Sequence, residues 1–555
     1  MPMRTLAELE RRRLEFGADA AAARLRGLRL LARTRLASAA AVRRLHELLC
    51  FIRAYPDDAA VRAQAARMLD GFAQRADLRA HATALATSGI AGTAIHFRFF
   101  AAQAQWLAAL WPAQLSLDRR DRDADERIAR ALQVLLEHAE GVSLREVPRP
   151  GFATLDRLRG RDETDAVFLL RRIAAMPGDG FTREAFSDAV DASYTLAPGP
   201  GTPSRSTAVW PKAPLVFRRT PPPRARPDLR AELQRPPRRV RRLPLADGQA
   251  LIDLARGAMV TRERSLEAFA YADARDAWLV DDGDGLAYAF AGVVPERRHA
   301  VFSYYGALTL RNGVPIGYTQ ADVLGPSAAL SFNTFESFRG AEAAHTFARW
   351  LAALRALFGC TSFTIEPYQL GAHNDEAIAS GAWWFYAKLG FVPRDAATRA
   401  LAKQERERQQ RRPSHRTSPA MLARLAQRHL YFDLDPAAPR PLVTPAMAGD
   451  AVSAALVSCG ARDADRGVHA LASELWHACA PGLRPPRGSD AWRAWQRLAP
   501  LLARLPLARW TAGERLALVA LARGKAGRSE RAFVRAWQAH AQLDAALLRL
   551  WARGR

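Results

Sequence analysis

The residues best suited to chemistry lie in the segment TFESFRGAEAAHTFARW, residues 334–350. Its pattern predicts a strand that ends near Phe335, a short loop, and a helix that opens mostly with small residues. The free N–H groups of a helix's first turn, together with the partial positive charge there, can bind an anion. An arginine in the loop adds a charge-assisted contact. The segment therefore predicts a phosphate site formed by Arg339, Gly340, Ala341, Ala343 and Ala344.

A second segment, GAWWFYAKLGF at residues 381–391, concentrates aromatic side chains. Its apolar residues recur at helical spacing, and Gly390 suits the left-handed conformation that ends a helix. A strand is expected to begin at Phe391. The spacing leaves two interpretations of Tyr386 open, a reactive phenol or an ordinary core residue.

Strand patterns that could position these segments occur only between residues 246 and 435. Two hairpins are predicted, with turns at DDGDG (281–285) and at Asn312-Gly313, a pair typical of type I′ turns. The aspartates of the first turn lack the spacing and the closing glutamate of an EF-hand, so calcium binding is not indicated. Further strands are predicted at 329–335, 361–368, from 391 and at 429–435, with helices at 341–359 and 374–389 and a charged helical insertion at 394–427.

The rest of the chain reads as helical. Residues 1–194 and 436–555 show apolar residues at helical spacing, whereas twelve of the 34 prolines lie between residues 198 and 244. We therefore predict a mainly helical, multidomain α+β protein with a central mixed β-sheet domain. The expected domains are 1–194 (helical), 195–245 (Pro/Arg-rich linker), 246–435 (sheet) and 436–555 (helical).

The order of elements in 246–435 resembles the GNAT superfamily of acyl-CoA N-acyltransferases. The shared features are a β-meander, a phosphate-binding strand-loop-helix, another strand, and a helix that ends in a pattern like A-x-x-x-Y-x-K-x-G-F. Here Ala382, Tyr386, Lys388, Gly390 and Phe391 supply that last pattern. The resemblance covers about a third of the chain.

The resemblance implies an acyl-CoA-dependent N-acyltransferase that uses acetyl-CoA or another acyl-CoA as a substrate and requires no metal. Main-chain N–H groups of Phe332, Asn333 and Thr334 would hold the pantetheine, and the phosphate site predicted above would hold the pyrophosphate. Tyr386 matches the family's acid. For the base, our candidates are Glu336 and then Glu366. The amine acceptor is not implied.

Two positions depart from the family pattern. Glu342 stands where the family usually has glycine, so its carboxylate must turn outward if a diphosphate is to bind beside it. Position 379 is alanine where family enzymes often carry asparagine. These departures support an alternative, a non-catalytic interaction protein with a degenerate GNAT-like domain whose helical flanks bind a protein partner.

Composition and residue spacing argue against a nucleic-acid-binding protein, a disulfide-stabilised or zinc-binding protein, and a membrane-spanning protein. The formal net charge is +25, but only four of the 81 basic residues are lysines, a bias that points to a GC-rich genome more than to a nucleic-acid surface. The four cysteines form no C-x-x-C pair, so neither a disulfide framework nor a zinc knuckle is indicated. The charged N-terminus and the absence of a long apolar segment predict a cytoplasmic protein without a membrane span.

Overall fold

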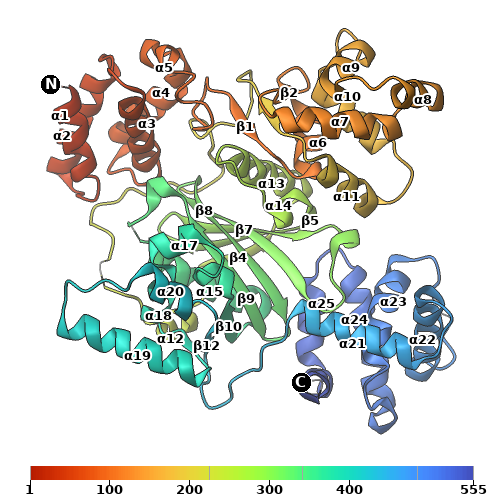
Figure 1. Ribbon diagram of the computed structural model, residues 1–555. Helices are drawn as coiled ribbons and strands as arrows, with labels where there is room; N and C mark the ends of the chain where they lie inside the picture. Colours follow the sequence, from red (N-terminus) through yellow and green to blue (C-terminus); the bar gives the residue numbers. More distant parts are fainter. Residues whose placement is uncertain (1, 224, 341, 484–485, 554–555) are drawn as a thin grey trace.

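The computed structural model describes residues 2–223, 225–340, 342–483 and 486–553. Within these ranges the chain is an α+β protein with 26 α-helices, a mixed sheet of nine strands and a small sheet of three, which confirms the predicted class. Figure 1 shows the large sheet at the centre, with helical regions arranged around it. No helix in these ranges is both long enough and apolar enough to cross a bilayer.

The large sheet has the strand order β11-β12-β10-β9-β8-β7-β6-β5-β4. All neighbours are antiparallel except β9 and β10, which run parallel. The strands are β4 (Arg239–Arg242), β5 (Ala272–Gly283), β6 (Leu286–Val293), β7 (Ser303–Arg311), β8 (Val314–Leu324), β9 (Ser327–Thr334), β10 (Ser362–Ile365), β11 (Val392–Pro393) and β12 (Leu430–Asp433).

Both predicted hairpin turns are confirmed. Asn312 and Gly313 have φ of 49° and 77°, and Asp284 and Gly285 have 49° and 76°, as a two-residue type I′ turn requires. The carboxylate of Asp282 in the first turn is ion-paired with the buried Arg349 at 2.6 Å. Asp282 therefore ties this turn to the helix that contains Arg349.

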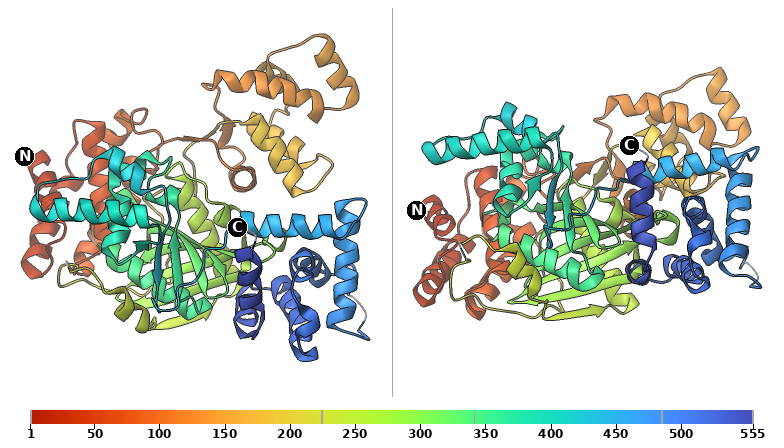
Figure 2. Two further views of the ribbon diagram at one scale, coloured as in Figure 1. Left: turned by 60° about the horizontal axis from the view of Figure 1, so that its bottom comes forward. Right: turned by 90° about the horizontal axis from the view of Figure 1, so that it is seen from below.

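The parallel strands β9 and β10 are joined by α15 (Ala343–Phe358), which crosses one face of the sheet. After β10 come the short helices α16 (Pro367–Leu370), α17 (Asp375–Ser380) and α18 (Ala382–Lys388). The single helix predicted at 374–389 is divided because Gly381 has a φ of 68°, the left-handed conformation. The insertion forms α19 (Ala396–Arg411) and α20 (Pro419–Leu425), and in Figure 2 α19 lies at the end of the molecule that carries the N-terminal helices.

The two faces of the sheet belong to different cores. Side chains alternate between the faces of a strand, so that Leu330 packs with α15 and the C-terminal helices, whereas Leu308 and Ile316 pack with the N-terminal helices and α13 (Leu245–Val260). The short helix α14 (Glu267–Ala270) precedes β5. The helical ends of the chain thus bury the sheet from both sides.

Residues 1–194 contain two cores. The first helices share the core of the sheet: α1 (Pro2–Arg11), α2 (Ala18–Ala32), α3 (Ala39–Ala54), α4 (Ala59–Asp70) and α5 (Ala76–Ala80). Residues 95–196 largely form a core of their own around the small sheet, with order β1-β3-β2. Their elements are β1 (Ile95–Phe97), α6 (Ala101–Leu110), β2 (Leu115–Leu117), α7 (Arg122–Leu135), α8 (His138–Glu146), α9 (Gly151–Leu158), α10 (Asp165–Ala174), α11 (Gly180–Val190) and β3 (Tyr194–Leu196).

The Pro/Arg-rich segment is more than a connector. It contains α12 (Leu229–Gln234), which packs beside α15, and β4, which forms one edge of the large sheet. Its proline content hid both elements, because proline at such density predicts irregular chain.

The C-terminal helices are joined to the sheet by buried charged groups. Lys525 pairs with Glu530 and donates to the carbonyl oxygen of Phe302 at 2.6 Å, and the carboxylate of Asp276 on β5 accepts the N–H of Glu530 at 3.0 Å. These helices are α21 (Pro445–Ser458), α22 (Ala464–Cys479), α23 (Asp490–Leu502), α24 (Ala512–Ala526), α25 (Arg531–Ala539) and α26 (Leu543–Arg553).

Candidate functional site

The most distinctive feature of the sheet is a free edge on β9. The parallel pairing with β10 ends at Leu330 and Ile365, although β9 continues to Thr334 in register with β8. Main-chain groups of residues 331–334 that point toward β10 therefore lack a strand partner. Among the described residues, only the side chain of Arg339 forms a hydrogen bond to these main-chain groups: its Nε donates to the carbonyl oxygen of Thr334 at 3.2 Å. Of the residues predicted to hold pantetheine, Phe332 and Thr334 present their main-chain groups to this edge. The prediction is wrong for Asn333, because the pattern set by the bond from Phe335 N–H to the carbonyl oxygen of Ile316 directs its main-chain groups to Tyr318 of β8.

The loop after β9 leads to an uncapped helix N-terminus. Glu342 precedes α15 but makes no side-chain capping hydrogen bond, so the first N–H groups of the helix are not satisfied by that side chain. Gly340 has a φ of 79°, and a Cβ there would meet nothing within 4 Å. Ala343 begins the helix, and Ala341 lies outside the described residues. Arg339 is not a free cation, because it is ion-paired with Glu376 at 2.7 Å.

The carboxylate of Glu342 turns away from this loop. It is buried, paired with Arg311 at the end of β7 and with Arg218 at 3.0 Å, and it accepts a hydrogen bond from Tyr55 of α3 at 3.1 Å. The side chain that could have opposed a phosphate is thus neutralised by two arginines on the far side of the loop.

A cavity of about 820 Å³ opens beside the start of α15 and α18; we call it the α18 cavity. Its charged groups are the cations Arg226, Lys388 and Arg416, and no described Asp or Glu lines it. Burial lowers the pKa of Lys388, and the two arginines lower it further. The full lining is Arg226, Ala344, Ile378, Ala379, Ser380, Gly381, Trp384, Phe385, Lys388, Leu389, Gln409, Pro413, His415, Arg416, Thr417, Pro419 and Leu422.

Tyr386 lies behind the wall of this cavity. Its ring packs against Phe347, Phe385 and Phe391 and is only 3% exposed, and burial raises the pKa of the phenol. No described residue is hydrogen-bonded to the Tyr386 hydroxyl, which leaves it able to donate a proton. Tyr386 itself, however, is not among the residues that line the cavity. Phe385, its neighbour, does line it and stacks on Phe332 of β9 at 6.1 Å between ring centroids.

The opposite face of β7–β10 is polar. Asp322 on β8 lies directly across from Tyr304, and it accepts a hydrogen bond from Gln320 at 3.0 Å. Burial raises the pKa of Asp322 to about 7, and the charge of Glu366 adds to the increase. Glu366 is the residue that follows β10, and its side chain is exposed at that end of the strand. Desolvation of its carboxyl group by the surrounding protein raises its pKa.

The sequence analysis missed Asp322, although one signal was present. An aspartate between Ala321 and Val323 in a predicted strand must face away from the core. What the pattern could not supply is the group's neighbours, since Tyr304 and Glu366 come from other strands.

Glu336, the first candidate base, begins the short turn Glu336–Phe338 that follows β9. It is ion-paired with Arg43 at 3.4 Å with 77% of its side chain exposed, at the wall of a second cavity of about 270 Å³. We call this the arginine cavity, because five arginines line it: Arg43, Arg205, Arg262, Arg264 and Arg339. Glu336 is therefore ion-paired at the surface, in a cavity that Asn333 of β9 also lines.

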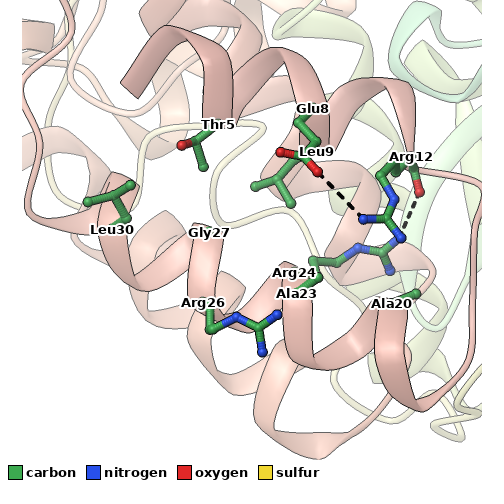
Figure 3. Close-up of a pocket in the computed structure, with 10 residues that line it drawn as sticks. All are labelled: Thr5, Glu8, Leu9, Arg12, Ala20, Ala23, Arg24, Arg26, Gly27 and Leu30. Carbon is green, nitrogen blue, oxygen red and sulfur yellow. Dashed lines mark hydrogen bonds and ion pairs between the residues drawn. The ribbon is translucent and has the colours of Figure 1, made fainter. Parts of the chain in front are cut away.

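A third hollow, of about 340 Å³, lies between α1 and α2 and is drawn in Figure 3. Arg24, on its floor, is paired with the buried Asp57, and Arg12 is paired with Glu8 at 3.5 Å. Gly27 allows the two helices to approach, because a Cβ there would lie 2.9 Å from Leu9. These contacts join helices, and we assign the hollow no chemistry. In the described ranges, His, Cys, Asp and Glu form no group of three or more that could hold a metal.

Comparisons with models of known protein families, with curated proteins and with solved structures find no match for this chain. The functional assignment therefore rests on the residues and the geometry described above.

Proposed function

We propose that the chain is an acyl-CoA-dependent N-acyltransferase that moves an acyl group from coenzyme A to an amine. The observation that carries the proposal is the free edge of β9 at residues 331–334. An extended ligand with amide groups can bind such an edge through main-chain hydrogen bonds, as an added strand does. The pantetheine arm of coenzyme A is a ligand of this kind.

The charge distribution supports the same ligand. The N-terminus of α15 lies just after the free edge. The α18 cavity next to it provides three cations, and no Asp or Glu is among its described lining residues. A helix N-terminus and arginine side chains both favour phosphate groups. Glu342 does not oppose them, because Arg311 and Arg218 hold its carboxylate on the other side.

The chemistry requires a base, an acid and a polarised carbonyl group. Asp322 is the proposed base, because its raised pKa lets it accept a proton from an ammonium group near neutral pH. The deprotonated amine forms a bond to the thioester carbon, and main-chain N–H groups of β9 stabilise the oxyanion. The C–S bond then breaks, the amide nitrogen loses its remaining extra proton to water, and the phenol of Tyr386, which must first reach the α18 cavity past Phe385, gives its proton to the leaving thiolate.

The proposal is tested by thermal denaturation of the full chain with and without acetyl-CoA. At about 100 times the dissociation constant, binding stabilises the fold by about 2.7 kcal/mol. Lys388→Gln and Arg416→Gln should weaken this effect, whereas Lys403→Gln, on the exposed surface of α19, should not. No stabilisation by acetyl-CoA or by longer acyl-CoAs would contradict the proposal, and equal stabilisation of all variants would place the ligand elsewhere.

A non-catalytic interaction protein is the second candidate. Two observations favour it: Arg339 is already ion-paired with Glu376, and Tyr386 lies behind Phe385. This candidate predicts that acyl-CoA binding, if present, is not followed by release of free thiol with any amine.

A further inference from the structure

The arginine cavity contains one arginine that forms no ion pair with a described residue, although Glu263 also lines the cavity and the charge of Glu47 acts on this arginine. Four of its five arginines are ion-paired: Arg43 with Glu336, Arg205 with Glu47, and Arg264 and Arg339 with the shared Glu376. Arg262 has no ion pair with any described residue. It donates only to the carbonyl oxygen of Ala258 and to the hydroxyl of Thr261, and its guanidinium lies 3.6 Å from the centroid of the Phe335 ring.

The surroundings of Arg262 make its charge costly. Its Nε is enclosed and has no hydrogen-bond acceptor, and the same is true of the Nε of the buried Arg205. Burial lowers the pKa of Arg262 well below the ordinary value, and the charge of Arg205 lowers it further. Because a guanidinium stays protonated in proteins, a bound anion would offset this cost.

The arginine cavity and the α18 cavity lie on opposite faces of the end of β9. Asn333 lines the arginine cavity, whereas its neighbour Phe332 points to the other face and stacks on Phe385 of the α18 cavity. Tyr318, across from Asn333 on β8, is hydrogen-bonded to Arg264 at 3.3 Å. The arginine cavity therefore opens on the face that carries Asp322.

We propose that the arginine cavity is the acceptor pocket and that Arg262 binds a carboxylate or phosphate group of the amine acceptor. This inference rests on the proposed function and names its substrate class. Arginine suits both groups, because its planar fork matches their oxygen atoms.

The positions on β8 also set the length of the acceptor. Gln320 and Asp322 lie two and four residues beyond Tyr318 on the same face. At about 3.3 Å per residue, these positions lie roughly 7 to 13 Å along β8 from Tyr318, which contacts Arg264 at the wall of the arginine cavity. The acceptor is therefore an amine separated from its anionic group by several bonds, and an α-amino acid such as glycine is too short.

The anion site is tested without any acyl-CoA. Thermal denaturation of the full chain is compared in inorganic phosphate, in succinate and in chloride at one ionic strength. We expect phosphate, succinate or both to raise the melting temperature, and Arg262→Gln to weaken the binding about tenfold or more. Arg262→Gln should fold, because no ion-pair partner is left behind, and Arg130→Gln on α7 is the matched control with unchanged binding.

Two results would overturn the anion site. One is the absence of stabilisation by both anions relative to chloride. The other is a response that Arg262→Gln leaves intact and Lys388→Gln removes, which would place the anion in the α18 cavity. Neither result depends on acetyl-CoA binding, so failure here is distinguishable from failure of the proposed function.

The acceptor role is tested by acyl transfer with matched amines. We expect 6-aminohexanoate and 8-aminooctanoate to be better acceptors than hexylamine and octylamine, and better than glycine, with the advantage lost in Arg262→Gln. Aminoalkyl phosphates of the same lengths separate a phosphate preference from a carboxylate preference. If the neutral amines react as well as the charged ones, the arginine cavity is not the acceptor pocket.

Discussion

Arg311 and Glu342 form a buried ion pair that joins the end of β7 to the residue before α15. The pair also receives Arg218 from the Pro/Arg-rich segment and Tyr55 from α3. One carboxylate therefore connects the sheet, the N-terminal helices and the connecting segment next to the first turn of α15.

We predict that Glu342→Gln strongly destabilises the fold. The change leaves Arg311 buried without its counter-charge, and breaking a buried pair costs about 3 to 5 kcal/mol. Urea unfolding measures the difference. Glu336→Gln removes an exposed carboxylate and should change stability by no more than about 0.5 kcal/mol. A loss below about 1 kcal/mol for Glu342→Gln would show that the pair matters little.

Tyr386→Phe should lower kcat by about 10² to 10⁴ without changing the affinity for acetyl-CoA, because the change removes only the proton that the leaving thiolate needs. Tyr368→Phe, at an exposed position, is the control. Steady-state kinetics and calorimetric titration give the two quantities. Unchanged turnover would make Tyr386 a core residue only.

Asp322 should impose a pH dependence on the reaction. A base with a pKa of about 7 gives a rate that rises with pH through that value and then levels off. Asp322→Asn should remove this rise and lower kcat by about 10² to 10⁴. Glu366→Gln, nearby on the same face, should have a smaller effect. If Glu366→Gln is the more damaging change, the two roles are reversed.

The raised pKa of Asp322 should also make the stability of the fold depend on pH. Folding raises its pKa from 3.8 to about 7, so the folded state holds the proton more tightly and stability falls as pH rises between these values. The fall is at most about 1.4 kcal/mol per pH unit. Asp322→Asn should therefore gain stability relative to the unchanged protein at pH 8 but not at pH 4, as urea unfolding at the two values would show. An equal effect at both would mean that the carboxyl group titrates normally.

Lys525→Met should destabilise the protein by about 3 to 5 kcal/mol, because the buried Glu530 would be left with only the more distant Arg298, at 3.9 Å, as a counter-charge. Adding Glu530→Gln should restore part of the loss, since the unpaired charge is then removed. Denaturant unfolding of the single and double variants gives the coupling between the residues. Additive losses would indicate that the two side chains act independently.

Local patterns in the sequence predicted much of the central fold. The two type I′ turns, α15 and the glycine after α18 all follow from residues that are close together in the chain. Their conformations depend on backbone chemistry that one short segment determines.

Contacts between residues far apart in the chain could not be predicted from local sequence patterns. The end of the β9–β10 pairing depends on register between strands, and the partners of Glu342 come from residues 55, 218 and 311. Arg339 could be recognised as a loop cation, but its pairing with Glu376 of α17 depends on how α17 packs. The arginine cavity likewise combines segments far apart in the chain, which no single stretch reveals.

The contacts of Lys525 and Glu530 bear on how this protein can be divided. A fragment that stops at residue 435 looks self-contained in the sequence, yet it would strip the cover from Asp276, Phe302 and the neighbouring apolar surface of the sheet. Such a fragment should aggregate when expressed. The sequence suggests separable domains, whereas the contacts of the folded chain make the sheet and the C-terminal helices one structural unit.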